Sequence, residues 1–212
     1  MKLTWLGHAS FLLETASGTR LLTDPYPQSI YPHRVPACGF AALSHEHYDH
    51  NHTEDLPGTP VLLRRDETLL AGKKIHCGDI LLTALSSFHD EVQGQKRGKN
   101  AVYIFEADGL KIAHMGDIGH ELTPALFEGL QGLDALLLPV GGTYTVTGEQ
   151  AAAMAKALKP RYIVPMHYAL PGCPLDISDA SSFLSAMEGT PATRASALTF
   201  KEPEGIVLLE KM

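Results

Sequence analysis

The histidines and aspartates of this 212-residue chain nearly all stand immediately after a short apolar run. Runs of about four to eight apolar or alternating residues predict strands. In layered α/β folds, functional side chains collect where strand ends open into loops. The sequence therefore predicts a fold in which strand ends from distant parts of the chain converge on one site.

The densest of these positions is His45-Glu46-His47-Tyr48-Asp49-His50, which follows the run from Ala41 to Ser44. With 11 His and 11 Asp in the chain, an H-x-H-x-D-H match arises by chance with a probability on the order of one in a thousand. A solvated polar loop is the plain alternative, but three imidazoles packed this closely need partners for their nitrogens. Imidazoles and a carboxylate together favour Zn, Mn or Fe over an all-oxygen Mg or Ca site.

Further metal ligands can come from three other predicted strand ends. Each carries a histidine or an aspartate directly after an apolar run: His89, Asp117 and His167. Taken singly, a histidine of this kind is more often a hydrogen-bonded structural residue, and an aspartate in a Gly-flanked turn is usually a turn residue. Together with the cluster at positions 45–50, they predict a metal centre built from the whole chain.

The pattern of the chain predicts a β-rich α/β (α+β) fold. Expected strands are residues 3–6, 10–14, 20–23, 41–44, 61–64, 80–85, 101–106, 110–115, 133–140, 161–165 and 205–210. Expected helices are 123–129, 147–158, where Thr147 and Gln150 match a capping box, and 178–187. Residues 10–24 and 101–117 share one layout, in which two strands flank a Gly turn and end at an aspartate. This echo predicts two related halves packed sheet on sheet, with helices outside.

Composition limits the kinds of protein that this chain can be. Its length and its 44% hydrophobic content fit one domain spanning residues 1–212. A formal net charge of −7 argues against a nucleic-acid partner. The three cysteines form no C-x-x-C pair, there is no signal-peptide core, and no apolar run approaches the roughly 18 residues of a membrane span. We therefore expect a cytoplasmic protein with no membrane partner; the oligomeric state stays open.

With these motifs the chain resembles the metallo-β-lactamase superfamily, specifically the stand-alone metal-dependent hydrolases that include the ascorbate-phosphate lactonase relatives. The resemblance runs from residues 5–11 and Thr23-Asp24-Pro25 through the H-x-H-x-D-H segment to residues 165–168. It implies a four-layer αββα sandwich with a dinuclear metal site at one edge. In the ligand sets that it implies, Asp117 bridges two ions, the first held by His45, His47 and His89, and the second by Asp49, His50 and His167.

The resemblance implies a metal-dependent hydrolase with two divalent transition-metal ions, most simply Zn, with Mn or Fe as alternatives. Two ions sharing a water would give hydroxide near neutral pH, with Asp49 as the residue that orients it and accepts its proton in the transition state. The expected substrate is a small ester, lactone or phosphodiester. The alternative from another class is an iron-dependent redox enzyme of the same fold, acting on oxygen or persulfides. The chain shows no insertion of the kind that RNA-processing relatives use.

Several residues outside the ligand sets are candidates for contact with substrate. The resemblance places His8 and Asp24 near the metals, where a carboxylate could fix a ligand histidine, although packing roles fit them equally. His120 and Tyr144 could contact substrate oxygens, and the basic segment 96–99 could attract a small anionic substrate, although such a loop is usually just solvated. The remaining histidines His33, His52 and His76 are expected to be surface or structural residues.

Overall fold

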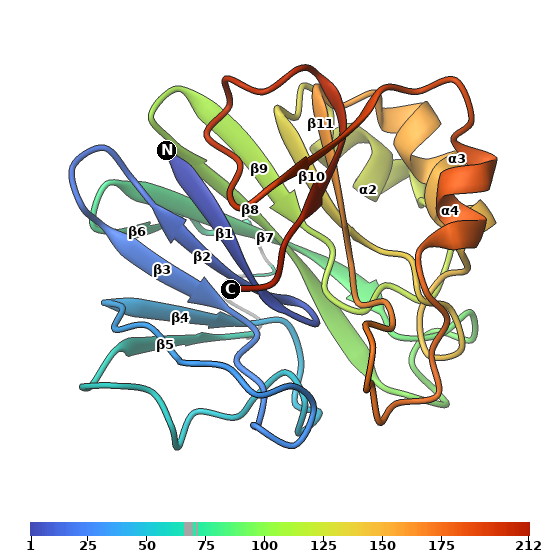
Figure 1. The fold of residues 1–212 in the computed structure, drawn as a ribbon. Helices are drawn as coiled ribbons and strands as arrows, with labels where there is room; N and C mark the ends of the chain where they lie inside the picture. Colours follow the sequence, from blue (N-terminus) through green and yellow to red (C-terminus); the bar gives the residue numbers. More distant parts are fainter. Residues whose placement is uncertain (66–69, 71) are drawn as a thin grey trace.

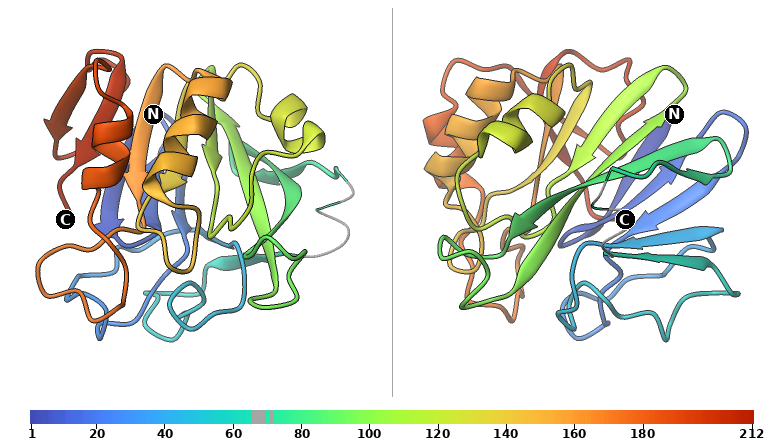
Figure 2. Two further views of the ribbon diagram at one scale, coloured as in Figure 1. Left: turned by 90° about the vertical axis from the view of Figure 1, so that its right-hand side faces the viewer. Right: turned by 180° about the vertical axis from the view of Figure 1, so that it is seen from behind.

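A computed structural model describes residues 1–65, 70 and 72–212. Two β-sheets lie face to face, and helices cover the outer face of the larger sheet (Figure 1). The view from behind shows the same order of layers, from helices through the larger sheet to the smaller one (Figure 2). The predicted mixed α/β sandwich is confirmed. No helix in the described part of the chain has the length and apolar character needed to cross a membrane.

The smaller sheet has the order β1-β2-β3-β4-β5 and contains the first five strands in sequence. Their bounds are β1 Lys2–Gly7, β2 Ser10–Glu14, β3 Arg20–Thr23, β4 Phe40–Leu43 and β5 Val61–Arg64. β1, β2 and β3 pair antiparallel, whereas β4 and β5 are added in parallel. The H-x-H-x-D-H segment directly follows β4, so it lies at one end of the strands of this sheet.

The larger sheet has the order β12-β13-β11-β10-β9-β8-β7-β6. Its strands are β6 Ile75–Cys77, β7 Ile80–Phe88, β8 Lys99–Ala107, β9 Leu110–His114, β10 Ala135–Pro139, β11 Tyr162–Met166, β12 Ala192–Ala195 and β13 Gly205–Leu209. β7, β8 and β9 form an antiparallel meander, and β10 and β11 continue from β9 in parallel. This arrangement repeats that of the smaller sheet, as the echo between the two halves predicts.

In the part of the chain that the structure describes, the helices with assigned bounds are α2 Pro124–Gly129, α3 Gly148–Leu158 and α4 Ser181–Ala186. Thr123 caps α2 with Pro at the first turn, and Thr147 and Gln150 form the predicted capping box of α3. The last helix begins later than the predicted residue 178, because the backbone of Ser178 is bonded to Gly141 and Ala169. Sequence patterning therefore located the helices and missed one boundary.

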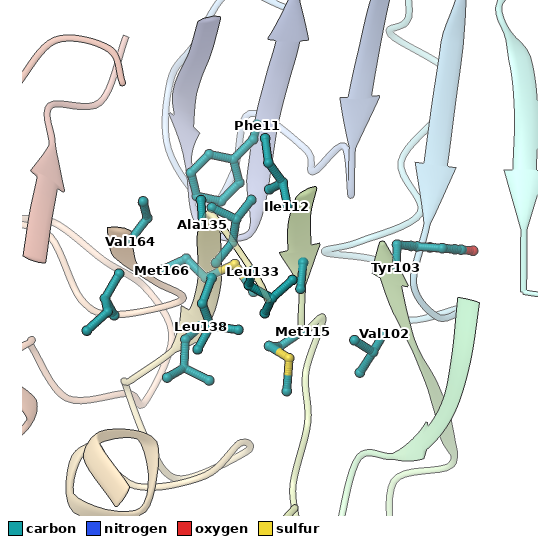
Figure 3. Close-up of a cluster of buried hydrophobic side chains, with 14 of the residues drawn as sticks. Phe11, Val102, Tyr103, Ile112, Met115, Leu133, Ala135, Leu138, Val164 and Met166 are labelled. Carbon is teal, nitrogen blue, oxygen red and sulfur yellow. The ribbon is translucent and has the colours of Figure 1, made fainter. Parts of the chain in front are cut away.

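The main hydrophobic core lies between the sheets and under the helices. Figure 3 shows Phe11 from the smaller sheet close to Ile112 and Ala135 of the larger one. A second cluster covers the outer face of the smaller sheet, where Leu6, Leu12, Leu22 and Ala41 are packed against Tyr26, Ile30, Tyr31 and Leu56 from loops. In the described residues that face is therefore covered by loops, whereas the helices cover the opposite side of the sandwich.

Candidate metal centre

Strand ends from both sheets bring the predicted site residues together. The H-x-H-x-D-H segment follows β4 of the smaller sheet, and His8 lies in the tight connection between β1 and β2. From the larger sheet, His89 follows β7, Asp117 follows β9 and His167 follows β11. The site therefore lies where the two sheets meet, with side chains that are far apart in the sequence.

The first group consists of His45, His47 and His89. The centroids of their rings are 4.7 to 4.9 Å apart, and one nitrogen from each ring lies within 4.8 Å of the others. His45 and His89 are buried, and His47 is exposed. Among the described residues, Nε2 of His45 has no hydrogen-bond partner although it is buried. Three nitrogens that converge in this way form a ready set of metal donors.

The second group consists of His8, Asp49, His50 and His167, whose donor atoms also lie within 4.8 Å of one another. Nε2 of His8 is 3.1 Å from Oδ2 of Asp49 and 3.1 Å from Nε2 of His50. All three histidines are buried and Asp49 is half-buried. The structure thus adds His8 to the three side chains that the resemblance assigns to a second ion.

Asp117 lies between the two groups. Its Oδ2 is 3.0 Å from Nε2 of His89 in the first group, and 3.2 Å from Nε2 of both His50 and His167 in the second. The carboxylate is 2% exposed, and its Oδ1 has no hydrogen-bond partner among the described residues. A buried carboxylate shared by two sets of imidazoles is the arrangement expected of a bridging ligand.

A buried carboxylate behind the site fixes the orientation of two of these rings. Oδ2 of Asp24 accepts a 3.0 Å hydrogen bond from Nδ1 of His50 and a 2.6 Å bond from the hydroxyl of Ser44, while its Oδ1 accepts from the Ser44 backbone N–H. The Ser44 hydroxyl oxygen is also 2.9 Å from Nδ1 of His45. Because Nδ1 of His50 donates to Asp24, the lone pair of its Nε2 is directed into the site.

Asn100, which the sequence reasoning did not single out, holds the turn that carries Asp117. Its Oδ1 accepts from the Asp117 backbone N–H at 3.0 Å, and its Nδ2 donates to the Met115 carbonyl and the Ser87 hydroxyl. Gly116 has φ +53°, and an added Cβ there would collide with the Asn100 side chain. The sequence feature that could have indicated this role is a polar Asn beside the apolar run of a predicted strand.

The pKa values of His8 and His45 suit donors to a metal. Burial and the neighbouring His167 lower the pKa of His8 to about 4, and burial lowers the pKa of His45 well below its ordinary value. Both rings are therefore neutral near pH 7, with an electron pair available. Burial also disfavours charge on His50, but Asp117 and Asp24 outweigh it and raise its pKa well above the ordinary value. A cation between His50 and Asp117 would take the place of that proton.

The residues present therefore fit bound transition-metal ions. The donors are imidazole nitrogens and carboxylate oxygens, which suit Zn, Mn and Fe. Two buried atoms of candidate ligands, Nε2 of His45 and Oδ1 of Asp117, lack any hydrogen-bond partner among the described residues. Buried polar atoms without partners are costly, and coordination would satisfy both.

A cleft of about 360 Å³ opens onto the centre. Its lining side chains come from both groups and from the loops around them: His47, Tyr48, Asp49, His89, Arg97, Asp117, Tyr144, His167 and Leu175. Of the residues expected to contact substrate, Tyr144 lines this cleft. His8 and His120 do not. His8 is fully buried, and Nε2 of His120 accepts the Phe88 N–H while its Nδ1 contacts the Glu121 carbonyl.

The remaining histidines lie outside both groups. His52 pairs with Asp55 at the surface, His76 is exposed, and His33 stacks on Tyr26. His114, a further buried histidine, is 2.8 Å from the Ala9 carbonyl through Nε2, and its Nδ1 accepts from the Gly116 N–H. Both of its nitrogens are thereby used within the protein, so its role is to join the two sheets.

Comparison with known proteins identifies the chain's relatives. A family model described as the beta-lactamase superfamily domain matches residues 2–167. A UPF0173 protein from Pyrococcus furiosus is 32% identical over 185 residues, covering 79% of this chain and 83% of the relative. A UPF0173 metal-dependent hydrolase from Archaeoglobus fulgidus is 30% identical over 195 residues, covering 79% of this chain and 83% of the relative.

Among solved structures, a candidate Zn-dependent hydrolase of the metallo-beta-lactamase superfamily from Thermotoga maritima is similar over almost its whole length. The TM-score is 0.78 at 30% identity, covering 98% of this chain and 97% of the other. The family model, the relatives and the similar solved structure all indicate the same family. The chain therefore belongs to the metallo-beta-lactamase superfamily, within the UPF0173 group of metal-dependent hydrolases.

Proposed function

We propose that this hydrolase cleaves a small ester, lactone or phosphodiester at a centre of two transition-metal ions. The observation that carries the proposal is the position of Asp117, whose Oδ2 is within 3.2 Å of ring nitrogens from both histidine groups. A single ion would need only one of these groups. Two groups that share one carboxylate favour a dinuclear centre.

The first ion would be held by His45, His47 and His89, and the second by Asp49, His50 and His167, with Asp117 between them. His8 is a candidate for a further donor to the second ion, because its Nε2 lies as close to His50 as two ligands of one ion do. Zn is our first choice of metal, with Mn or Fe as alternatives, because the donors are nitrogen and oxygen. The description of the Thermotoga maritima protein as Zn-dependent supports this choice.

Bound ions would supply the Lewis acidity that makes water a nucleophile near neutral pH and polarises the scissile group. Asp49 lines the cleft, and its Oδ2 is already engaged with Nε2 of His8. Burial would raise the pKa of Asp49, but the His8 hydrogen bond and the neighbouring histidines hold it far below its ordinary value. A carboxylate this acidic is a weak base, so its role is to orient the attacking water.

Tyr144 also lines the cleft, on the loop between β10 and α3. Its phenol can donate a hydrogen bond to a substrate oxygen. The cleft volume of about 360 Å³ fits a small molecule and is at the lower end of the range for ligand sites. We therefore propose a small-molecule substrate, with no nucleic-acid or membrane partner.

The cytoplasm is the location that we propose. All three cysteines, Cys38, Cys77 and Cys173, are free, although Cys38 and Cys173 are not fully buried. Free cysteines that are accessible to solvent persist most readily in a reducing compartment.

The test is hydrolysis by protein loaded in turn with Zn, Mn and Fe, using lactone, carboxylic ester and phosphodiester substrates. We expect turnover of at least one class, loss of activity on chelation, and a decrease in kcat of at least about 100-fold in Asp49→Asn. His52→Ala is the matched control, since His52 is a surface histidine two residues beyond the cluster, and it should retain wild-type activity. Metal-loaded protein that is inert on all three classes would contradict the proposal.

A further inference from the structure

The loop between β7 and β8 carries a cation into the cleft. Of the basic side chains in residues 96–99, only Arg97 lines the cleft beside the metal centre. Lys96 instead pairs with Glu91 at 2.8 Å, and Lys99 is exposed and does not line this cleft. Arg97 is therefore the member of this basic segment that a substrate would meet.

The backbone of this loop is fixed by the buried carboxylate of Asp90. Its Oδ1 accepts from the N–H groups of Val92 and Gly94, and its Oδ2 from those of Lys96 and Arg97, at 2.7 to 2.9 Å. The loop is closed at its base by a hydrogen bond from the His89 N–H to the Gly98 carbonyl. Arg97 therefore projects from a pre-organised loop whose first residue is itself a candidate metal ligand.

The side chain of Arg97 is also held by contacts with the loop between β10 and α3. Its Nη2 donates to the Thr143 carbonyl at 3.2 Å, and its guanidinium carbon is 5.6 Å from the centroid of the Tyr144 ring. Stacking on an aromatic ring holds a guanidinium in one plane while leaving its edge free to bind. The contact therefore joins the β7–β8 loop to the β10–α3 loop.

Among the described residues, no carboxylate lies within ion-pair distance of the Arg97 guanidinium. Its side-chain hydrogen bond to the Thr143 carbonyl uses one of five N–H groups. The carboxylates of the lining are Asp49 and Asp117, which the proposed function assigns to metal ions. With both carboxylates so engaged, the cleft has an excess of positive charge on the side of Arg97.

From these contacts we infer that Arg97 binds an oxyanionic group of the substrate, a carboxylate or a phosphate located away from the scissile bond. The guanidinium presents a planar fork that matches either oxyanion, and Tyr144 holds that fork in place. The inference rests on the proposed hydrolase function and narrows its substrates to small anionic esters, lactones or phosphodiesters. Arg97 is on this view a specificity residue, since it binds a part of the substrate that does not react.

The test compares two substrates that differ in one charge. Mono-4-nitrophenyl succinate carries a free carboxylate, and its methyl ester is a neutral molecule of nearly the same shape. For zinc-loaded Arg97→Ala we expect KM for the anionic substrate to rise about tenfold, because a hydrogen-bonded charge is lost, with little change in kcat. Both constants for the neutral ester should stay within about twofold of wild type. Rates are corrected for uncatalysed hydrolysis.

Two variants serve as controls for charge and for the loop. Arg97→Lys keeps the positive charge but lacks the planar guanidinium. Its KM for the anionic substrate should therefore lie between those of wild type and Arg97→Ala. Lys96→Ala removes the neighbouring cation, whose partner is Glu91, and should leave KM for both substrates unchanged. A parallel loss on both substrates in Arg97→Ala, or an equal effect of Lys96→Ala, would overturn the inference.

Binding without turnover separates this inference from the hydrolase function. Calorimetric titration of the zinc-loaded protein with succinate and with inorganic phosphate should show binding that is about tenfold weaker in Arg97→Ala. If the ester substrates are inert and this difference is present, the choice of reaction is wrong and the anion site stands. If wild type binds neither anion, or if both proteins bind them equally, the anion site is wrong.

Discussion

Three residues of the centre share a backbone conformation that is uncommon outside glycine. His8 and His167 have φ +51° and Asp24 has φ +36°, and each stands where a strand ends. His and Asp are among the residues that tolerate this region best, but the conformation still costs free energy. Its recurrence at three positions of one site shows that the chain turns sharply there to direct these side chains inward.

The role of His8 can be tested by metal affinity. Removing a donor from the second group should weaken the binding of one ion, so we expect His8→Ala to raise Kd for the second Zn by about 10- to 100-fold. Competition with a chromogenic chelator measures both affinities. His33 lies outside both groups, so His33→Ala should bind zinc with wild-type affinity. Two unchanged affinities in His8→Ala would rule out a part for His8 in the centre.

The cysteines give a prediction that depends on pH. Burial raises the pKa of Cys77 to about 11, so at pH 8 only about a thousandth of it is the reactive thiolate. We expect a thiol reagent at pH 8 to label Cys38 and Cys173 in the native protein and to label Cys77 only after unfolding. The fraction of thiolate rises tenfold for each pH unit up to about 11. Equal labelling of all three cysteines in native protein would contradict the structure.

How far the sequence reveals the site differs from residue to residue. The H-x-H-x-D-H segment is recognisable because its spacing is local and rare, and the resemblance supplied the pairing with His89, Asp117 and His167; their roles as ligands stay predictions. Asn100 and the partners of Arg97 were not predicted, because their contacts join segments distant in the sequence. His120 was expected at the substrate, but its ring is bonded to backbone groups.

At the scale of elements, one unit occurs in both sheets. An antiparallel hairpin, β2–β3 or β8–β9, is followed by two parallel strands, β4 and β5 or β10 and β11. Asp24 follows the first hairpin and lies behind the site. Asp117 follows the second hairpin and lies at the centre of the site. Local patterning revealed this layout because each strand is a distinct apolar run.

The elements that the sequence analysis missed are short. β6 has three residues and β12 has four, and both lie at sheet edges. Such strands are defined by their pairing partners, which sequence patterning does not contain. β7 extends to Phe88, beyond the predicted end at Leu85, because the backbone of residues 86–88 continues to pair with residues 99–101 of β8.

Gly141, which follows β10, limits how the end of β11 is placed. An added Cβ there would collide with the carbonyl oxygen of His167. Gly141→Ala should therefore displace His167 and weaken the binding of the second ion at least about tenfold. It should also lower the free energy of unfolding by about 2 kcal/mol. Chelator competition and denaturant unfolding measure the two effects.

Gly39→Ala is the matched control for this prediction. Gly39 likewise lacks a positive φ, and its added Cβ would meet nothing closer than the Arg20 carbonyl at 3.9 Å. It should leave both quantities near wild type. Wild-type metal affinity in Gly141→Ala would show that His167 does not depend on this close approach.

At the scale of the whole molecule, the centre joins the two sheets. His45, His47, Asp49 and His50 come from the smaller sheet, and His89, Asp117 and His167 from the larger one. Ions bound between these residues would therefore link the two sheets. The single-domain assignment for residues 1–212 is consistent with this arrangement and stays a prediction.

Metal removal should therefore lower the thermal stability of the entire fold. An ion present at about 100 times its Kd stabilises a protein by about 2.7 kcal/mol, which corresponds to about 5–10 °C in Tm for a chain of this size. We expect chelation to lower the Tm of wild type by at least this amount. In Asp117→Ala the same chelator should have little effect. An unchanged Tm for wild type would mean that bound metal does not link the sheets.

The central claim is that one carboxylate, Asp117, joins two sets of donors into a dinuclear centre. Native mass spectrometry of Zn-reconstituted protein, after removal of free metal, tests it most directly. We predict two Zn ions per wild-type chain and at most one, weakly held, in Asp117→Ala, with His52→Ala again binding two. A wild-type chain that retains one ion or none, or an Asp117→Ala chain that still holds two tightly, would contradict the claim.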